Sequence, residues 1–240
     1  MQIKFRCLPE LEPHLLRPVK AASGLPDWLK DMPSSAASDV LDGAEVRTLK
    51  HCAPLLDAMQ TGMLFPLACD VQVRAGEFSW DWNLPRNPSS RQTRSPIGVH
   101  MPEQAEGMPG AGDADNFLIK FNNFWTIATP PGVSLLIVHP LNRPDLPFHT
   151  FSGIVDCDSY TSGFVHFPAR WTDADFAGVL PRGTPVAQAI PFRREALEPD
   201  FAEMSAQELA DHGYEQDALQ ADPGHYRKHR RVKRTRVMSE

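Results

Sequence analysis

The stretch from Thr129 to Val138, Thr-Pro-Pro-Gly-Val-Ser-Leu-Leu-Ile-Val, decides the fold class. Its Pro-Pro-Gly unit predicts a tight turn, because proline fixes φ and glycine accepts the left-handed region. Residues 133–138 then form a short apolar run with the length of a buried strand. Similar short runs follow at residues 151–155, 164–167 and 186–192. Short strands separated by turn residues predict a mainly β core.

The sequence on the N-terminal side of this stretch has the same character. Residues 63–73 are apolar and end in alternation, and residues 117–128 also favour strands. Proline accounts for 23 of the 240 residues, about twice the usual share. Because each proline removes a backbone donor and resists helix interiors, this composition disfavours a helical bundle.

Short helices are expected at the edges of this core. Residues 54–60 can form one or two helical turns, with Gly62 well placed to end them. Ser205 is followed three residues later by Glu208, which is the pattern of a capping box at a helix start. The predicted fold is therefore mainly β with small peripheral helices.

Composition divides the chain into three parts. We expect an N-terminal extension at residues 1–45, the β core at residues 46–195, and a C-terminal helix with a basic tail at residues 196–240. Within the core, residues 83–116 are rich in Pro, Gly, Ser, Asn and Asp and predict a long loop insertion. A loop of this length inside a compact domain is usually functional or mobile.

Charge is unevenly distributed along the chain. The formal net charge is −6, but residues 227–240 carry seven Lys or Arg against one Glu, which leaves 17 basic and 29 acidic residues, a net charge of −12, on the first 226. An acidic body repels nucleic acid, whereas a basic tail attracts anions. The basic residues at 227–236 are expected to contact an acidic partner or to lie in solvent against the acidic body.

Cysteine usage and hydropathy predict the compartment. The four cysteines are scattered and include no CxxC pair, so no zinc knuckle is expected. No apolar run approaches the ~20 residues of a membrane-spanning helix. The first residues lack the apolar region of a signal peptide. The sequence predicts a cytoplasmic protein with reduced thiols and no membrane partner.

Two carboxylates provide the first candidate site. Asp156 and Asp158 are two residues apart, so an extended chain places both on one face. Like charges this close tend to raise the pKa of one carboxyl, which suits a general base near neutral pH. Tyr160 follows with a flat ring for a base or sugar, and the side chain of Gln188 can donate to phosphate oxygens.

Four blocks of the sequence, in order, resemble motifs of the dUTPase and dCTP deaminase superfamily. They are Leu67-Ala-Cys-Asp-Val71, Thr129-Pro-Pro-Gly-Val133, Ser152-Gly-Ile-Val-Asp-Cys-Asp-Ser-Tyr160 and Leu180-Pro-Arg-Gly-Thr-Pro-Val-Ala-Gln188. The resemblance implies a β-clip fold, or distorted jelly roll, and usually a homotrimer with sites at subunit interfaces. It also implies hydrolysis of a nucleoside triphosphate to release pyrophosphate, with Mg²⁺ bound through the substrate phosphates. The chain also resembles a family of bacterial and phage proteins.

The same resemblance implies roles for individual residues. Asp156 would activate the attacking water, with Asp158 as the second carboxylate of the motif. Tyr160 would contact the base or sugar and Gln188 the phosphates. Three further candidates occupy the place of the family's phosphate-binding motif. They are His139, Asn142 and Arg143.

Departures from the family pattern leave two alternatives open. The chain lacks the serine of the family's Arg-Ser motif and its glycine-rich C-terminal motif. A non-catalytic scaffold or binding protein on the same fold is one alternative. The other is a non-haem, metal-dependent oxygenase, in which His139, His149 and Asp156 would bind Fe²⁺ as two histidines and a carboxylate. Outside that alternative we expect no metal bound by protein side chains alone.

The insertion at 83–116 contributes two further candidates. His100 and Gln104 lie within it, four residues apart. As polar side chains on a long loop, they could form a lid over a polar ligand.

Overall fold

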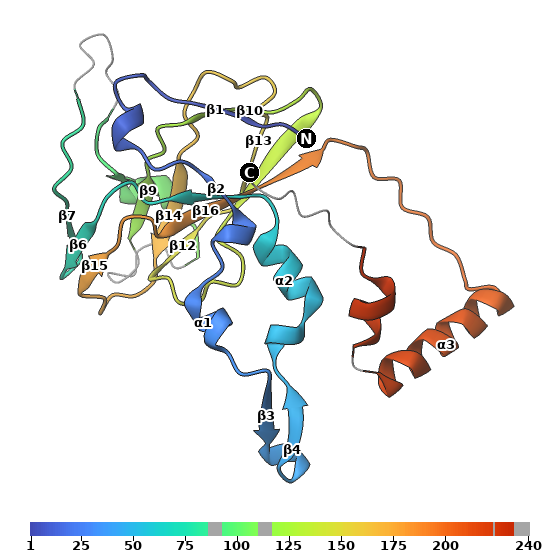
Figure 1. Cartoon of the computed structure of the whole chain (residues 1–240). Coiled ribbons are helices and arrows are strands. Elements are labelled where there is room, and N and C mark those ends of the chain that lie inside the picture. Colours follow the sequence, from blue (N-terminus) through green and yellow to red (C-terminus); the bar gives the residue numbers. More distant parts are fainter. Residues whose placement is uncertain (86–92, 110–116, 223, 233–240) are drawn as a thin grey trace. The chain divides into compact units, whose positions relative to one another are not determined.

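The computed structural model describes residues 1–85, 93–109, 117–222 and 224–232 (Figure 1). Short strands in antiparallel sheets dominate it, with a few short helices. The prediction of a mainly β protein with small helices is confirmed.

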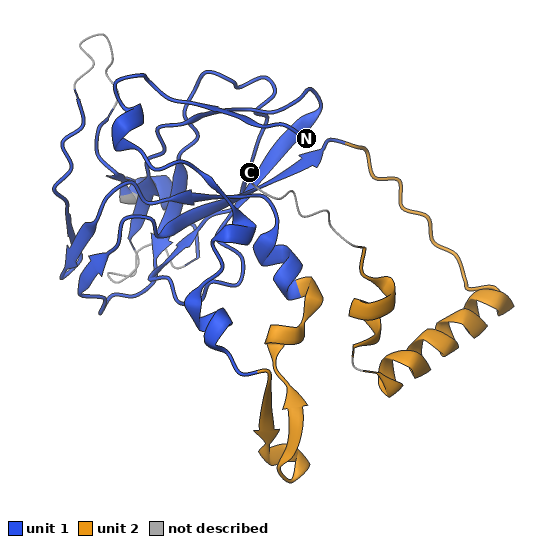
Figure 2. Cartoon of the chain, viewed as in Figure 1, with its two compact units in different colours: residues 1–33, 55–194 blue, residues 34–54, 195–240 orange. Residues whose placement is uncertain are grey.

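The chain forms two compact units (Figure 2). Unit 1 contains residues 1–33 and 55–194, and unit 2 contains residues 34–54 and 195–240. This division differs from the expected one, because the first 33 residues belong with the core rather than to an extension. The reason is strand pairing: β1 (Lys4–Arg6) pairs with β10 (Thr126–Ala128), and β2 (Val19–Lys20) pairs with β5 (Met63–Pro66).

A five-stranded antiparallel sheet runs through unit 1 in the order β13-β11-β16-β5-β2. Its central strands are β11 (Val133–Val138) and β16 (Pro185–Arg193), and β13 (Gly153–Val155) forms one edge. The register pairs Ser134 of β11 with Phe192 of β16, and Val138 with Gln188. The two strands therefore place the turn before β11 beside the end of β16.

Besides the β1-β10 pair, unit 1 contains two further sheets. The four-stranded sheet has the order β12-β14-β9-β8, and the three-stranded sheet the order β15-β6-β7. The strands of the first are β12 (Phe148–Thr150), β14 (Phe167–Trp171), β9 (Leu118–Phe121) and β8 (Ile97–Val99). Those of the second are β15 (Gly178–Leu180), β6 (Val71–Arg74) and β7 (Glu77–Ser79). The strand expected at 164–167 thus begins only at Phe167.

Aromatic side chains fill the core between these sheets. Phe121, Phe148, Phe167 and Trp171 are each about 1% exposed. Ring centroids lie 4.6 Å apart for Phe121 and Phe148, and 4.8 Å apart for Phe65 and Phe167. Burial of one such side chain stabilises a fold by about 1.5–3 kcal/mol, so this cluster is a main source of stability for unit 1.

The insertion expected at 83–116 contributes to the core. Residues 86–92 and 110–116 lie outside the described residues. Between them, β8 pairs with β9, and Ile97 is 4% exposed. A short helical turn, η5 (Pro102–Ala105), follows. Part of the predicted loop is therefore a strand of the four-stranded sheet.

Two short α-helices belong wholly or mostly to unit 1. They are α1 (Asp27–Asp31) and α2 (Ala53–Gln60). The helix end predicted at Gly62 is confirmed, with φ at +80°. A Cβ on Gly62 would lie 2.0 Å from the carbonyl oxygen of Ala189. Glycine is therefore needed both for the turn and for the close approach of α2 to β16.

Short 3-10 turns fill other connections of the first 51 residues, at Glu12–His14, Ala21–Ser23, Asp39–Leu41 and Leu49–His51.

Unit 2 contains a hairpin and the C-terminal segment. The hairpin pairs β3 (Ser35–Ser38) with β4 (Ala44–Arg47). Residues 195–205 form no regular element and lead to α3 (Ala206–Ala221). The capping box predicted from Ser205 and Glu208 is confirmed, with both reciprocal bonds present. One π-helical turn, η6 (Tyr226–Arg230), lies near the end of the described residues. Within the described ranges, no helix combines the length and apolar character needed to cross a bilayer.

Candidate functional site

The two predicted catalytic carboxylates lie where two turns meet. The Thr129–Gly132 turn precedes β11, and the Asp156–Tyr160 turn follows β13. The backbone N–H of Thr129 donates to the carbonyl of Cys157 (3.2 Å), and the N–H of Gly132 donates to Oδ2 of Asp158 (2.9 Å). Two of the blocks singled out in the sequence are therefore in contact.

Arg194, directly after β16, holds both carboxylates. Its Nη1 donates to Oδ1 of Asp158 (2.9 Å) and Oδ1 of Asp156 (3.2 Å), and its Nη2 to Oδ2 of Asp158 (2.5 Å). Ser134, which is fully buried, donates from Oγ to Oδ1 of Asp156 (2.6 Å) and accepts from Nη1 of Arg194 (2.8 Å). We call Ser134, Asp156, Asp158 and Arg194 the clamp.

The electrostatics of the clamp follow from the cation between the carboxylates. The hydrogen bonds from Arg194, and then the one from the Gly132 N–H, hold the pKa of Asp158 well below its usual range. The hydrogen bonds and charge of Asp158, with a smaller contribution from Asp156, raise the pKa of Arg194. The sequence-based expectation of a raised carboxyl pKa is therefore wrong for Asp158, because a guanidinium offsets the repulsion between the two carboxylates.

Burial sets the pKa of the Cys157 thiol, which lies between the two carboxylates in the sequence. Cys157 is fully buried, and burial, with further contributions from Asp156 and Asp158, raises its pKa to about 11. Its thiol is therefore protonated near neutral pH and unsuited to nucleophilic chemistry.

Asp156 and Tyr160 face solvent on the same turn. The side chain of Asp156 is 57% exposed, and Tyr160 is 51% exposed. The backbone N–H of Tyr160 donates to the carbonyl of Asp156 (2.8 Å), which fixes the turn. A Cβ on Gly163 would lie 2.0 Å from the Tyr160 hydroxyl, so glycine there leaves room for the ring.

The remaining predicted binding residues lie at the other end of β11. Ser134 is the second residue of that strand, and His139 follows its last residue. Five residues of extended chain span roughly 17 Å. The structure therefore does not bring His139, Arg143 and Gln188 together with the clamp.

Gln188 is 1% exposed, and its amide is fully engaged. Its Nε2 donates to the carbonyls of Ala58 (3.0 Å) and Thr61 (2.6 Å), and its Oε1 accepts from the N–H of Leu141 (2.9 Å). The carbonyls at the end of a helix lack intrahelical partners. Gln188 thus joins the end of α2 to the loop after β11, and its amide is turned away from solvent.

His139 also uses both ring nitrogens within the protein. Nδ1 accepts from the N–H of Thr150 (3.3 Å), so the proton lies on Nε2, which faces the carbonyl of Arg143 (3.1 Å). Burial lowers the pKa of His139, so the neutral ring is favoured. The ring of His149 stacks on it at 4.5 Å.

Arg143 forms a two-pronged ion pair with Asp145. Nε lies 2.8 Å from Oδ1 and Nη2 lies 2.7 Å from Oδ2, and Trp28 donates to the same carboxylate (3.1 Å). Burial would raise the pKa of Asp145, but the hydrogen bonds and charge of Arg143 outweigh it and the pKa is lowered. Asn142 has φ at +56° and turns the chain just before Arg143. The Arg143 side chain is 12% exposed, and its guanidinium is already paired.

The two histidines of the alternative metal site lie apart from its aspartate, and the two candidate lid residues contact each other. His139 and His149 lie beyond one end of β11, while Asp156 lies at the other. Among the described residues, no group of three or more His, Cys, Asp or Glu could hold a metal ion. Oε1 of Gln104 lies 3.3 Å from Nδ1 of His100 and accepts from the N–H of Met101 (2.9 Å), so this pair fixes η5 beside β8.

Sequence reasoning missed Arg194 and Ser134. The signal that could have found them is the pairing of the two predicted strands at 133–138 and 186–192. Antiparallel pairing of 133–138 with 186–192 brings the start of the first beside the residues that follow the second. Arg193 and Arg194, directly after an apolar strand, were the cations nearest to the carboxylates in that arrangement.

Unit 1 also has an open hollow of about 340 Å³, away from the clamp residues. Its lining consists of Phe5, Glu12, Arg17, Pro18 and Trp125. Arg17 pairs with Glu12 at 2.6 Å on its rim. None of the residues predicted from the sequence lines it.

Comparisons with known proteins assign no family. No protein-family model matches this chain, and a search of curated proteins finds no match. The function is therefore argued from the geometry alone.

Proposed function

We propose that this chain is a non-catalytic binding protein, in which the carboxylates of Asp156 and Asp158 are structural. The observation that carries this proposal is the guanidinium of Arg194, which hydrogen-bonds both carboxylates. A general base needs a lone pair aimed at the substrate and a pKa near the working pH. Asp158 accepts on both oxygens and has a lowered pKa, so it fits an ion pair better than a base.

The partners of the other predicted ligand contacts support the same proposal. Gln188, His139 and Arg143 each make their polar contacts inside unit 1. Turning such a group towards a phosphate leaves a buried partner without a hydrogen bond, which costs about 1–3 kcal/mol each time. Binding of a triphosphate by these residues would therefore require both the end of α2 and the loop after β11 to rearrange.

A second candidate function rests on the exposure of Asp156 and Tyr160. A carboxylate and a ring open to solvent on one turn fit the sugar and base of a nucleotide. In this alternative the core is a divergent β-clip of the dUTPase type, assembled as a homotrimer. Mg²⁺ would then be held by the substrate phosphates, and Asp156 would activate water for pyrophosphate release.

Pyrophosphate release separates the two candidates. Purified full-length protein is incubated with Mg²⁺ and each nucleoside triphosphate, alongside the Asp156→Asn variant. The binding-protein proposal predicts the same background rate for both proteins and for buffer. Turnover by the wild-type chain that disappears in Asp156→Asn would overturn it in favour of the second candidate.

Metal analysis of the same preparation tests the oxygenase alternative. That alternative requires stoichiometric iron, lost when His139 and His149 are replaced by alanine. The binding-protein proposal predicts no bound transition metal in either protein after purification in iron-supplemented medium. Thr150→Ala is a useful control, since it removes a buried hydroxyl contact near the same rings without removing a histidine.

A further inference from the structure

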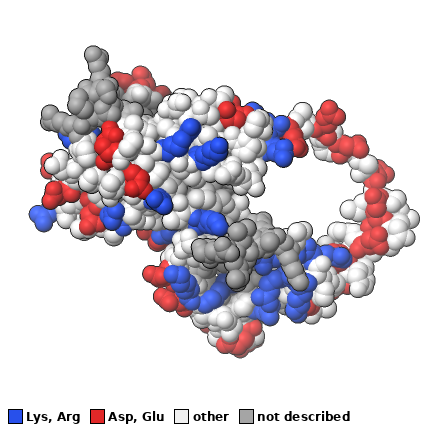
Figure 3. All heavy atoms as spheres, turned by 45° about the horizontal axis from the view of Figure 1, so that its top comes forward, with Lys and Arg blue, Asp and Glu red and all other residues white. Residues whose placement is uncertain are grey.

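The C-terminal end of unit 2 gathers cations and aromatic rings. The segment His225-Tyr-Arg-Lys-His-Arg-Arg-Val232, which we call the basic end, holds four Lys or Arg, two His and one Tyr. Residues 195–205, the linker before α3, contain four acidic residues and no basic one. Figure 3 shows acidic side chains along this linker and basic side chains gathered beyond it. The charge of unit 2 is therefore polarised along its sequence.

Ion pairs fold the basic end onto α3. Lys228 pairs with Asp222 (2.7 Å), and Arg230 forms a two-pronged pair with Glu215, Nε lying 2.9 Å from Oε1. Nε2 of His225 lies 3.3 Å from the same Glu215. These contacts use two of the cations to fix the turn η6. The basic end is thus a shaped element that can present its remaining side chains in a defined order.

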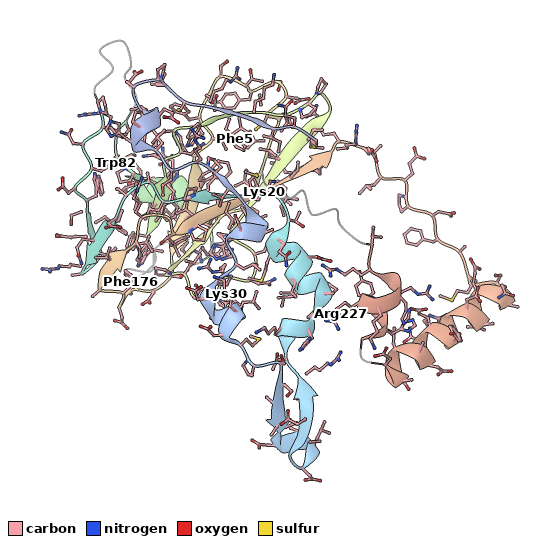
Figure 4. The ribbon with its side chains drawn as sticks, in the orientation of Figure 1. Phe5, Lys20, Lys30, Trp82, Phe176 and Arg227 are labelled. Carbon is pink, nitrogen blue, oxygen red and sulfur yellow. The ribbon has the colours of Figure 1, made fainter. Side chains whose placement is uncertain are left out.

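Two arginines are placed to meet an anion. Arg227, labelled in Figure 4, comes from η6 and is exposed. Arg47, exposed on β4, lies beside the turn that precedes η6: a Cβ on Gly224 would lie 3.3 Å from its Nη1, and its charge helps to lower the pKa of Asp222. Two segments far apart in the sequence thus direct guanidinium groups to one end of unit 2. Guanidinium groups bind phosphate oxygens in a two-pronged manner.

Aromatic side chains accompany these arginines. Tyr226 is 44% exposed at the start of η6, and Tyr214 is 70% exposed on α3, close enough to Arg230 to affect its pKa. The rings of His225 and His229 lie 4.9 Å apart. Flat exposed rings between cations are the pattern that stacks on unpaired bases.

We propose that the basic end of unit 2 binds single-stranded nucleic acid. Arg227 and Arg47 contact phosphates, and Tyr226 stacks on a base. An acidic protein would use the positive charge but not the exposed rings, which is why the observations favour nucleic acid. Lys233, Arg234 and Arg236 continue the positive charge in the sequence. The inference names a partner beyond the role proposed for the core, and it stands or falls separately from any turnover at Asp156.

Fluorescence anisotropy with a labelled oligo(dT) of about 20 nucleotides tests the inference on the full chain. With the two phosphate contacts of Arg227 and Arg47, log Kd against log salt has a slope of about 1.4. Affinity then falls about 7-fold between 50 and 200 mM salt. Arg227→Ala is expected to lower this slope by about 0.7 and to weaken binding several-fold.

Matched variants separate charge from stacking. Arg74→Ala, which removes an exposed arginine from β6 in unit 1, is expected to leave affinity unchanged. Tyr226→Ala is expected to weaken binding about 10-fold at constant salt slope, and Tyr226→Phe to keep it. Thermal unfolding of each variant checks that the fold is intact.

Three results would overturn the inference. One is an absence of binding at 50 mM salt. Another is equal loss of affinity in Arg227→Ala and Arg74→Ala. The third is binding of polyglutamate with the affinity of oligo(dT), because this outcome would assign the basic end to an acidic protein partner.

Discussion

Replacing Gln188 with alanine should destabilise unit 1 without affecting any ligand. The substitution removes three hydrogen bonds: two to the carbonyls of Ala58 and Thr61, and one from the N–H of Leu141. Each contributes about 1 kcal/mol to stability, and a partner left buried without a bond costs more. The expected loss in the free energy of unfolding is therefore about 3–5 kcal/mol.

This loss is large enough to measure by calorimetry. For a chain of this size, 1 kcal/mol shifts Tm by about 2–4 °C, so Gln188→Ala should unfold roughly 10 °C below the wild type. Gln72→Ala is the matched control, because its amide is only half-buried and donates to Gly178 (3.0 Å) from a strand elsewhere in unit 1. We expect a Tm drop there of about 3 °C or less.

Two results would contradict a structural role for Gln188. A Tm for Gln188→Ala within 2 °C or so of the wild type would show that the three contacts are not structural. If the same variant lost a nucleotide-dependent rise in Tm shown by the wild type, Gln188 would be a phosphate ligand, as the sequence resemblance suggested.

Three further predictions follow from the core. Arg194→Ala should raise the pKa of Asp158 towards its ordinary value, as measured by NMR titration. A carboxyl whose pKa is lowered by folding stabilises the fold at any pH above its pKa in the unfolded chain. The stability lost in this variant should therefore be largest near neutral pH and shrink as acid protonates Asp158. An unchanged pKa of Asp158 would contradict the clamp. Burial lowers the pKa of both His139 and His166, so urea unfolding should show stability falling as pH drops below about 6.5, where the unfolded rings take up protons. His139→Gln should reduce that pH dependence more than His149→Gln, and equal effects would count against the buried neutral ring. Gly62→Ala should lower Tm far more than Gly43→Ala, since both have positive φ but only Gly62 would place a Cβ against a carbonyl, and equal losses would mean that backbone strain alone decides.

The sequence predicted those elements that depend on neighbouring residues, such as an apolar run or a helix cap. The run at 133–138 became β11, and the capping box at Ser205 begins α3. The strand β8 was hidden, because Ile97-Gly-Val99 is short and surrounded by turn residues. It forms only because β9 is beside it, which is a long-range effect that periodicity cannot report.

The candidate site was predictable only in part, for the same physical reason. Asp156 and Asp158 do lie in one cluster, but on a turn after β13 and not on the extended chain from which their shared face was argued. The cation that decides their electrostatics comes from residue 194, and strand pairing alone brings it there. Similarly, nothing in the sequence around Gln188 indicates that the end of α2 lies beside β16. The carbonyl of Ala58 in α2 accepts a hydrogen bond from the Gln188 amide.

The most direct test of the central claim measures turnover and stability on the same preparations. Pyrophosphate release from Mg²⁺-nucleoside triphosphates and Tm are recorded for the wild type, Asp156→Asn and Asp158→Asn. If the clamp is structural, Asp158→Asn lowers Tm, and all three proteins release pyrophosphate at the rate of buffer alone. Release by the wild type that is lost in Asp156→Asn, with Tm unchanged, would contradict the account.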